Sequence, residues 1–197
     1  MNRAMYPCQL MGAQVVLREF RLNDLDAVMT VVGDDRVTTS LSFDTRTREQ
    51  TTAILDGIVG RAKKELRTEY YLAVTIMDDV LVGFARLGLD GVQAAKLGYA
   101  IAADHWGHGY ATDAARTLVD FGFRELRLHR ISAAMGPDNT ASIAIAHRLG
   151  MIYEGCIRDH VYTNGGWRNS LLYSVLVEEW AATGTAGRRA SRGVPRD

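Results

Sequence analysis

Short apolar or alternating stretches bounded by turn residues recur along the chain, as is typical of β-strands. They occur at Val15–Phe20, Tyr70–Ile76, Val80–Leu89, Ala94–Ala102, Arg130–Met135, Met151–Tyr162 and Ser170–Val177. Two of the connections, Met77-Asp78-Asp79 and Asn164-Gly165-Gly166, have the composition of hairpin turns. We therefore expect the strands on either side of each turn to pair.

Between these strands, apolar residues follow helical spacing. Helices are expected from Leu25 through Val32, from Thr47 through Ala62, from about Tyr110 to Glu125 and from Thr140 to Leu149. Asn23 is the expected cap of the first helix, and Thr47 with Gln50 forms a capping box for the second. Gly150 is the expected C-cap of the last helix. The order β-α-α-β-β-β-α-β-α-β-β predicts an α/β protein with a mixed sheet and helices packed against it.

Composition indicates an ordinary globular domain. The chain has 197 residues, of which 47% are apolar and 23% are charged, so it can form one core. Its 23 basic and 23 acidic residues give a net charge of zero, which argues against a protein that mainly coats nucleic acid. No apolar run reaches the roughly 18–20 residues of a membrane span. Two cysteines, Cys8 and Cys156, do not suffice for a disulfide framework.

The two ends of the chain differ from the middle. We expect residues 1–12 to form a flexible arm that is no signal peptide, and residues 13–180 to form a single domain in the cytoplasm. Residues 181–197 contain four arginines, one aspartate and almost no large apolar side chain. Such a segment cannot bury a face, so we expect a disordered tail, with a weak RNA or membrane-surface tether as the alternative.

A glycine-rich turn, Trp106–Thr112 (WGHGYAT), lies between the strand ending at Ile101 and the next helix. Its glycines allow close approach of a ligand to the backbone, and the free N–H groups of a first helical turn favour negative charge. This arrangement suits a phosphate or pyrophosphate, although a purely structural turn can have the same sequence. A second turn, at Pro137–Ser142, leads into the following helix, where Asn139 can serve as N-cap.

Taken together, these segments resemble the GNAT superfamily of N-acetyltransferases. Leu97–Thr112 is similar to its acyl-coenzyme A loop, and Asn139-x-x-Ser142 followed by Leu149-Gly150-Met151 is similar to the element after that loop. The opening VLREF-RLNDLD and the C-terminal segments resemble the RimJ/RimL-type branch, whose members acetylate protein N-termini. The likeness covers about residues 14–180. It implies the GNAT fold, a mostly antiparallel twisted sheet that is splayed at the acyl-CoA site and flanked by helices.

The resemblance also implies acetyl-CoA as cofactor and coenzyme A as product; no metal is expected. The pyrophosphate would be held by N–H groups of Gly107, His108, Gly109, Tyr110, Ala111 and Thr112. The strand ending at Ile101 would pair with the pantetheine arm, and an N–H near Ile101 or Ala102 would polarise the thioester carbonyl. Asn139 would hydrogen-bond the same arm. His105 and His108 lack a third ligand in sequence, so they do not predict a zinc site.

Ser142 matches the serine near the coenzyme sulfur in this branch and is the candidate catalytic proton donor. The tyrosine that many family members use falls on Ala146 in this sequence, and the glutamate that would act as base falls on Val161. The identity of the base is therefore open. Nearby alternatives are a water relay and the side chains of Glu154, Asp159 and His160.

The resemblance predicts an enzyme that transfers acetyl to a primary amine by direct attack on the thioester. The acceptor is a protein N-terminal α-amine, or the amine of a small metabolite or antibiotic. Arg36–Phe43 and Tyr162–Trp167 are the expected acceptor-side segments. A non-catalytic acyl-CoA-binding sensor is the alternative, because no carboxylate base is apparent. The family also implies a homodimer, which the sequence itself does not show.

Overall fold

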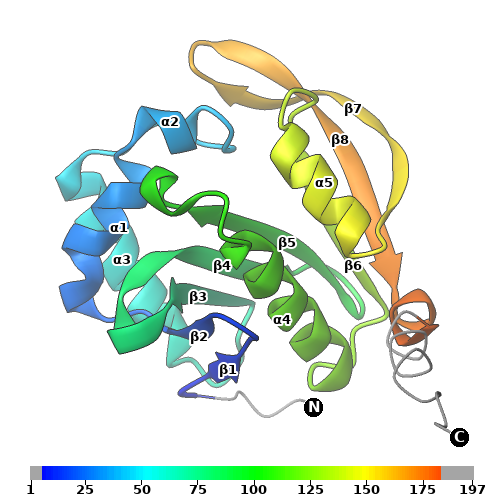
Figure 1. Cartoon of the computed structure of the whole chain (residues 1–197), viewed down its shortest axis with the longest axis horizontal. Coiled ribbons are helices and arrows are strands. Elements are labelled where there is room, and N and C mark those ends of the chain that lie inside the picture. The colour runs from blue at the N-terminus through cyan, green and yellow to red at the C-terminus, as the bar shows by residue number, and fades with distance from the viewer. Residues whose placement is uncertain (1–5, 183–197) are drawn as a thin grey trace, which may run out of the picture.

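The computed structural model describes residues 6–182 and is built around an eight-stranded sheet (Figure 1). The strands lie in the order β1-β2-β3-β4-β5-β6-β8-β7. Their bounds are β1 Gln9–Met11, β2 Val16–Glu19, β3 Glu69–Thr75, β4 Leu81–Leu89, β5 Ala94–Ile101, β6 Arg130–Met135, β7 Ile152–Thr163 and β8 Gly166–Leu176. All neighbours are antiparallel except β5 and β6. The predicted α/β architecture with a mostly antiparallel mixed sheet is confirmed.

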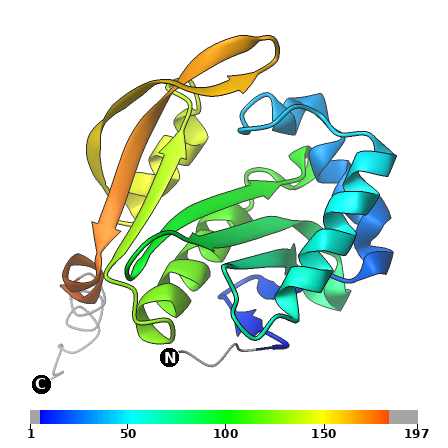
Figure 2. The same ribbon diagram turned by 180° about the vertical axis from the view of Figure 1, so that it is seen from behind.

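Helices cover both faces of this sheet (Figures 1 and 2). Their bounds are α1 Leu25–Val32, α2 Asp35–Thr38, α3 Arg48–Ala62, α4 Tyr110–Arg124 and α5 Thr140–Arg148, with short 3-10 turns at Leu22–Asp24, Met77–Asp79 and Ala103–His105. Among residues 6–182, none of the helices has both the length and the apolar character needed to cross a membrane. A further helix begins at Val177 and includes Ala181 and Ala182, so the first two residues of the predicted disordered tail 181–197 are helical; residues 183–197 lie outside the part of the chain that the structure describes.

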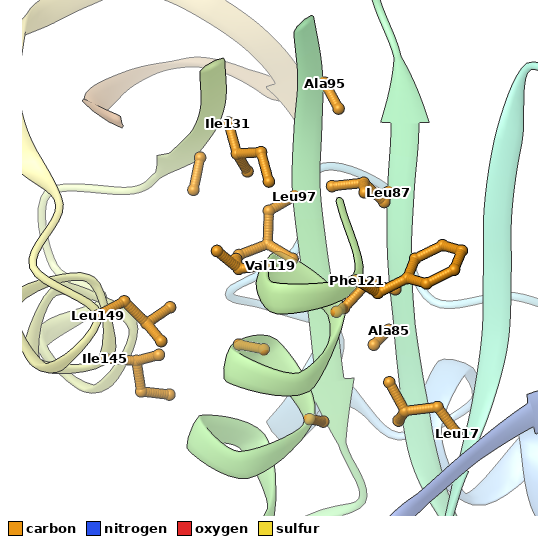
Figure 3. Packing of buried hydrophobic residues seen from close by; sticks show 14 of the residues in the cluster. Leu17, Ala85, Leu87, Ala95, Leu97, Val119, Phe121, Ile131, Ile145 and Leu149 are labelled. Carbon is orange, nitrogen blue, oxygen red and sulfur yellow. The ribbon is translucent and has the colours of Figure 1, made fainter. Parts of the chain in front are cut away.

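Alternation along the strands creates two apolar clusters, one on each face. On β3, Tyr70 and Leu72 belong to the cluster under α4 and α5, whereas Ala73 belongs to the cluster under α1 and α3. Figure 3 shows Val119 and Phe121 of α4 packed against the sheet in the first cluster. The central strands β3 and β4 are thus buried on both sides, and the two helix layers are held apart by a single layer of strands.

The ends of the helices follow local chemistry, with one exception. Thr47 and Gln50 form the predicted capping box of α3, and Gly150, with a φ of 70°, follows the last turn of α5. The expected cap at Asn23 is wrong. Asp24 instead precedes α1, and its buried carboxylate accepts hydrogen bonds from Arg18 at 2.8 Å and 2.9 Å. A buried ion pair needs such partners, so it determines how the chain enters α1.

The first strand, β1, lies within the segment 1–12 that the sequence predicts to be a flexible arm. Gln9–Met11 pairs with Val16–Arg18 of β2 and forms one edge of the sheet. The segment from Gln9 to Met11 is therefore ordered. Three residues with little alternation give too weak a pattern to indicate a strand, and the pairing with β2 is what defines it.

The sheet opens between its two parallel strands. β5 and β6 pair only where Ala94–Lys96 lies beside Arg130–Ser132. Beyond that point β5 stays paired with β4, and β6 stays paired with β8. The second half of each strand therefore has an edge without a neighbouring strand, and the two edges face a common gap.

Candidate active site

A cavity of about 380 Å³ lies where β5 and β6 separate. We call the part formed by β5, β6 and the start of α5 the strand half; it is lined by Leu97, Gly98, Tyr99, Ala133, Ala134, Met135, Asn139 and Ser142. We call the part formed by α3, the loop before it and the strands β3 and β4 the helix half; it is lined by Ser40, Leu41, Ser42, Phe43, Arg46, Ile54, Arg61, Glu69, Tyr71, Phe84 and Arg86. A larger hollow of about 760 Å³ beside β1 and β2 contains none of the catalytic or coenzyme-binding residues that the sequence suggests.

The open edge of β5 presents backbone groups to the gap. Ala102 donates its N–H to Val82 at 2.8 Å, so this donor points toward β4 and is already used. Because N–H groups alternate along a strand, the N–H of Ile101 points to the opposite side, toward the gap. Of the two donors that the sequence suggests for a thioester carbonyl, Ile101 is the one that remains available. The Trp106 indole binds the Ile101 carbonyl oxygen at 2.8 Å and holds the following turn against the strand.

Both glycines of the glycine-rich turn adopt a left-handed backbone conformation. Gly107 and Gly109 have φ values of 81° and 84°, a region that other residues enter only with strain. Gly109 precedes α4 and provides no side-chain cap; the first helical bond runs from Asp113 N to Gly109 O at 3.0 Å. Within residues 6–182, the N–H groups of residues 107–112 have no protein acceptor. Such a row of free donors fits an anionic group such as the pyrophosphate of coenzyme A.

Of the two histidines near this turn, His108 is held by its neighbours. The His108 ring stacks on Tyr110 at 5.4 Å, and its Nδ1 lies 2.9 Å from the Trp106 carbonyl oxygen. In the described part of the chain, no three His, Cys, Asp or Glu side chains converge as metal ligands would.

Asn139 and Ser142 meet at the start of α5. The Asn139 Oδ1 accepts the Ser142 N–H at 3.0 Å, which makes Asn139 the N-cap of the helix. Its amide Nδ2 has no acceptor within residues 6–182 and borders the cavity. Both side chains that the sequence singles out on this segment therefore line the strand half.

Tyr99 is a site residue that the sequence analysis did not identify. Burial raises the pKa of Tyr99, and the nearby Ser142 hydroxyl opposes that rise. Both side chains line the cavity, Tyr99 from β5 and Ser142 from the first turn of α5. Strand alternation is a signal that could have found this residue, because Tyr99 is two residues before Ile101 and shares its side of β5.

None of the three side chains considered as a base lines the cavity. Glu154 accepts hydrogen bonds from Arg130 and Ser174, each at 2.6 Å, and these bonds lower its pKa to about 2. The His160 Nδ1 lies 2.9 Å from the Ser170 hydroxyl. The carboxylate that does line the cavity is Glu69, which lies in the helix half.

The two expected acceptor-side segments lie against each other. Arg168, directly after Trp167, donates to the Thr39 carbonyl oxygen at 2.6 Å, and the Asn164 N–H donates to Asp44 at 2.7 Å. The β7–β8 hairpin therefore reaches the loop between α2 and α3 (Figure 1). From these segments, Ser40–Phe43 lines the cavity.

Comparison with known proteins identifies the family and the fold. Residues 14–152 match the model of the acetyltransferase (GNAT) domain. The N-acetyltransferase p20 of Bacillus licheniformis is 29% identical over 176 residues, which cover 85% of this chain and 96% of that protein. The structure of Mycobacterium smegmatis RimJ in complex with CoA-disulfide superimposes with a TM-score of 0.78 at 22% identity, covering 93% of this chain and 98% of that one.

A second solved structure has the same fold. RimL, a ribosomal L7/L12 α-N-protein acetyltransferase in complex with coenzyme A, superimposes with a TM-score of 0.75 at 19% identity and covers 87% of this chain and 99% of that one. The resemblance seen in the sequence is confirmed by these matches. The chain belongs to the GNAT family of N-acetyltransferases and has the fold shared by RimJ and RimL.

Proposed function

We propose that the protein transfers acetyl from acetyl-CoA to a primary amine, a protein N-terminal α-amine or the amine of a small molecule, in the gap between β5 and β6. The observation that carries this proposal is that three features follow one another in space. The free N–H groups of residues 107–112 come just after β5, the open edge of β5 faces the gap, and β5 also lines the cavity. In this reaction acetyl-CoA supplies an activated acetyl group as a thioester.

On the coenzyme side, the proposed roles follow from the free donors. The N–H groups of residues 107–112 bind the pyrophosphate, with the α4 dipole adding to their attraction. The N–H of Ile101 points into the gap and is the donor proposed for the acyl carbonyl oxygen. The Asn139 Nδ2 is proposed to donate to the pantetheine arm. Each of these groups lacks a protein acceptor within residues 6–182, so none has to break an existing bond to take up its role.

On the chemical side, the Ser142 hydroxyl is proposed to hold the proton that the departing sulfur requires. Tyr99 lines the same part of the cavity, and Ser142 recovers its proton from the acceptor nitrogen, which loses one as the amide forms. Glu69 is a poor base, because its bonds to Arg61 and Arg86 outweigh burial and lower its pKa. Tyr71 is no better, since burial raises its pKa to about 12. The ammonium proton of the acceptor is therefore proposed to pass to water before the attack.

The test combines calorimetry of acetyl-CoA with a thiol-release assay over a panel of amines. The panel contains N-terminal peptides, free amino acids, polyamines and amine antibiotics. We expect binding of acetyl-CoA and release of coenzyme A only when an acceptor is present. Turnover of peptides alone would identify a protein N-terminus as the acceptor, and turnover of small amines alone would identify a metabolite or antibiotic. No binding of acetyl-CoA would overturn the proposal.

A further inference from the structure

The helix half of the cavity carries more positive than negative charge. Its positively charged side chains are Arg46, Arg61 and Arg86, and its negatively charged side chain is Glu69. Three cations against one anion are unexpected beside a site proposed to receive an amine, because a protonated amine is repelled by them. The excess positive charge therefore indicates that the rest of the acceptor carries a negatively charged group.

Glu69 accounts for the pairing of two of these arginines. Its Oε1 accepts from the Arg61 Nε at 2.7 Å, and its Oε2 accepts from the Arg86 Nε at 2.6 Å. One carboxylate thus holds two guanidinium groups and neutralises one of their two charges. Both arginine side chains remain nearly half exposed, at 43% and 47%, so their outer N–H groups are open to solvent or ligand.

Arg46 has no counter-ion. Its guanidinium stacks on the Phe43 ring at 3.7 Å, and within residues 6–182 it forms no ion pair or side-chain hydrogen bond. The loop that carries it is fixed, since the Arg46 N–H donates to the Val32 carbonyl oxygen at 2.9 Å. The group is half-buried, and this burial lowers its pKa. Stacking covers a face of the guanidinium and leaves the N–H groups on its edge free to bind.

The four charged side chains line the same cavity as Gly98. Gly98 lies opposite Arg86 in the β4–β5 register, and a Cβ added there would meet nothing within 4 Å. The space beside Arg86 is therefore open, and the cavity around it is bordered mainly by cationic groups.

We propose that the acceptor carries a carboxylate close to its reacting amine, and that Arg46 binds this carboxylate. The inference rests on the proposed function. A planar guanidinium with free edges matches the two oxygens of a carboxylate and can bind both. The surrounding positive charge also favours the neutral form of the amine, which is the form that attacks. The carboxylate belongs either to a free amino acid or to an acidic residue near a protein N-terminus, whereas a polyamine has no such group.

The test measures kcat/KM for matched acceptors that differ only in this carboxylate. One arm compares N-terminal peptides with glutamate or glutamine at the second position, and the other compares a free amino acid with its amide. Rates are expressed per unprotonated amine, so that differences in amine pKa do not enter. We expect a preference of about tenfold or more for the acidic member in one arm, which identifies the source of the carboxylate. Spermidine should be a poor acceptor.

Substitution then assigns this preference to one side chain. Arg46→Gln should reduce the ratio between acidic and neutral acceptors to about twofold or less, and Arg46→Lys should retain part of it. The matched control is Arg48→Gln, because Arg48 lies outside the cavity and pairs with Asp26 at the surface. This control should keep the full ratio. Binding of acetyl-CoA by each variant confirms that it is folded.

The outcomes separate this inference from the proposed function. Efficient transfer without any preference for the acidic acceptor, or a preference that survives Arg46→Gln, would overturn the inference and leave N-acetyl transfer intact. A preference for spermidine would overturn it as well. Transfer to none of the amines despite binding of acetyl-CoA would overturn the proposed function, and the inference with it.

Discussion

Ser142 and Tyr99 bring two hydroxyl groups together where β5 and β6 separate. Both side chains line the cavity, and burial raises the pKa of Tyr99. The Ser142 N–H is tied independently to the Asn139 side chain at 3.0 Å. The position of the serine backbone therefore does not depend on its hydroxyl, which makes the hydroxyl a clean target for substitution.

Ser142→Ala removes the proposed proton donor and little else. We expect kcat to fall about 100-fold, the lower end of the range for general acid–base catalysis, with the Kd for acetyl-CoA changed less than about twofold. Steady-state kinetics and calorimetry measure the two quantities. Ser142→Thr keeps a hydroxyl and serves as the control. If Ser142→Ala turns over at the normal rate, the serine has no part in the mechanism.

Gly109→Ala tests the glycine-rich turn. The positive φ of 84° should cost about 1–2 kcal/mol of stability in the free protein. Relief of this strain moves the N–H groups of the turn, so the Kd for acetyl-CoA should rise about tenfold. Gly91→Ala is a matched control, with a φ of 71° and open space around it, in a turn outside the site. Equal effects of both substitutions on the Kd would show that the turn does not bind the coenzyme.

At the scale of elements, the first turn of α4 is connected to the chain that leads into β2. Asp113 accepts the N–H groups of Ala13, Gln14 and Val15 at 3.0, 2.6 and 3.1 Å. A carboxylate near a helix N-terminus is also stabilised by the helix dipole. The segment before β2 is thereby held against the start of the helix that follows the glycine-rich turn.

Asp113→Ala should destabilise the protein by about 3 kcal/mol, because three backbone donors lose a charged acceptor at once. Urea unfolding gives the difference. Asp26→Ala is the control, since Asp26 is 83% exposed in its pair with Arg48 and should change stability by less than about 0.5 kcal/mol. A loss as small as that of the control would mean that water replaces Asp113 without cost.

The ion pair between Arg130 of β6 and Glu154 of β7 spans the intervening strand β8 and predicts a pH dependence. The pKa of Glu154 is lowered from 4.5 to about 2 by its bonds to Arg130 and Ser174. Its contribution to stability is therefore complete above pH 4.5 and is lost as the pH falls toward 2. Glu154→Gln should be less stable than the wild type by about 1 kcal/mol or less at pH 7, because the pair is partly exposed. Urea unfolding at several pH values should show the gap closing below pH 4.5; a gap that stays constant would contradict the role of the pair.

Most elements could be predicted from the sequence because their signals are local. The capping residues Thr47 and Gln50 and the turn at Asn164 each require only a few neighbouring residues. The predictions that were wrong concern segments whose structure is determined by contacts with residues distant in the sequence. β1 exists because it pairs with β2, and Asp24 replaces Asn23 at the start of α1 because it binds Arg18.

At the scale of the whole molecule, the site is assembled from segments that are far apart in sequence. The glycine-rich turn, Asn139 and Ser142 were identified because they belong to motifs. Tyr99, Glu69 and Arg46 were not, because only the register of β3, β4 and β5 and the path of the loop before α3 bring them to one cavity. The charge of the acceptor side is consequently a property of the fold.

Amide hydrogen exchange with and without acetyl-CoA shows most directly where the coenzyme binds. Saturating acetyl-CoA should slow exchange at Tyr99 and Ile101, on the open edge of β5, and at residues 107–112. Exchange at the paired centre of β3 and β4 should be unchanged. Acetyl-CoA that binds without protecting residues 97–112, or protects another part of the chain, would contradict the placement of the coenzyme between β5 and β6.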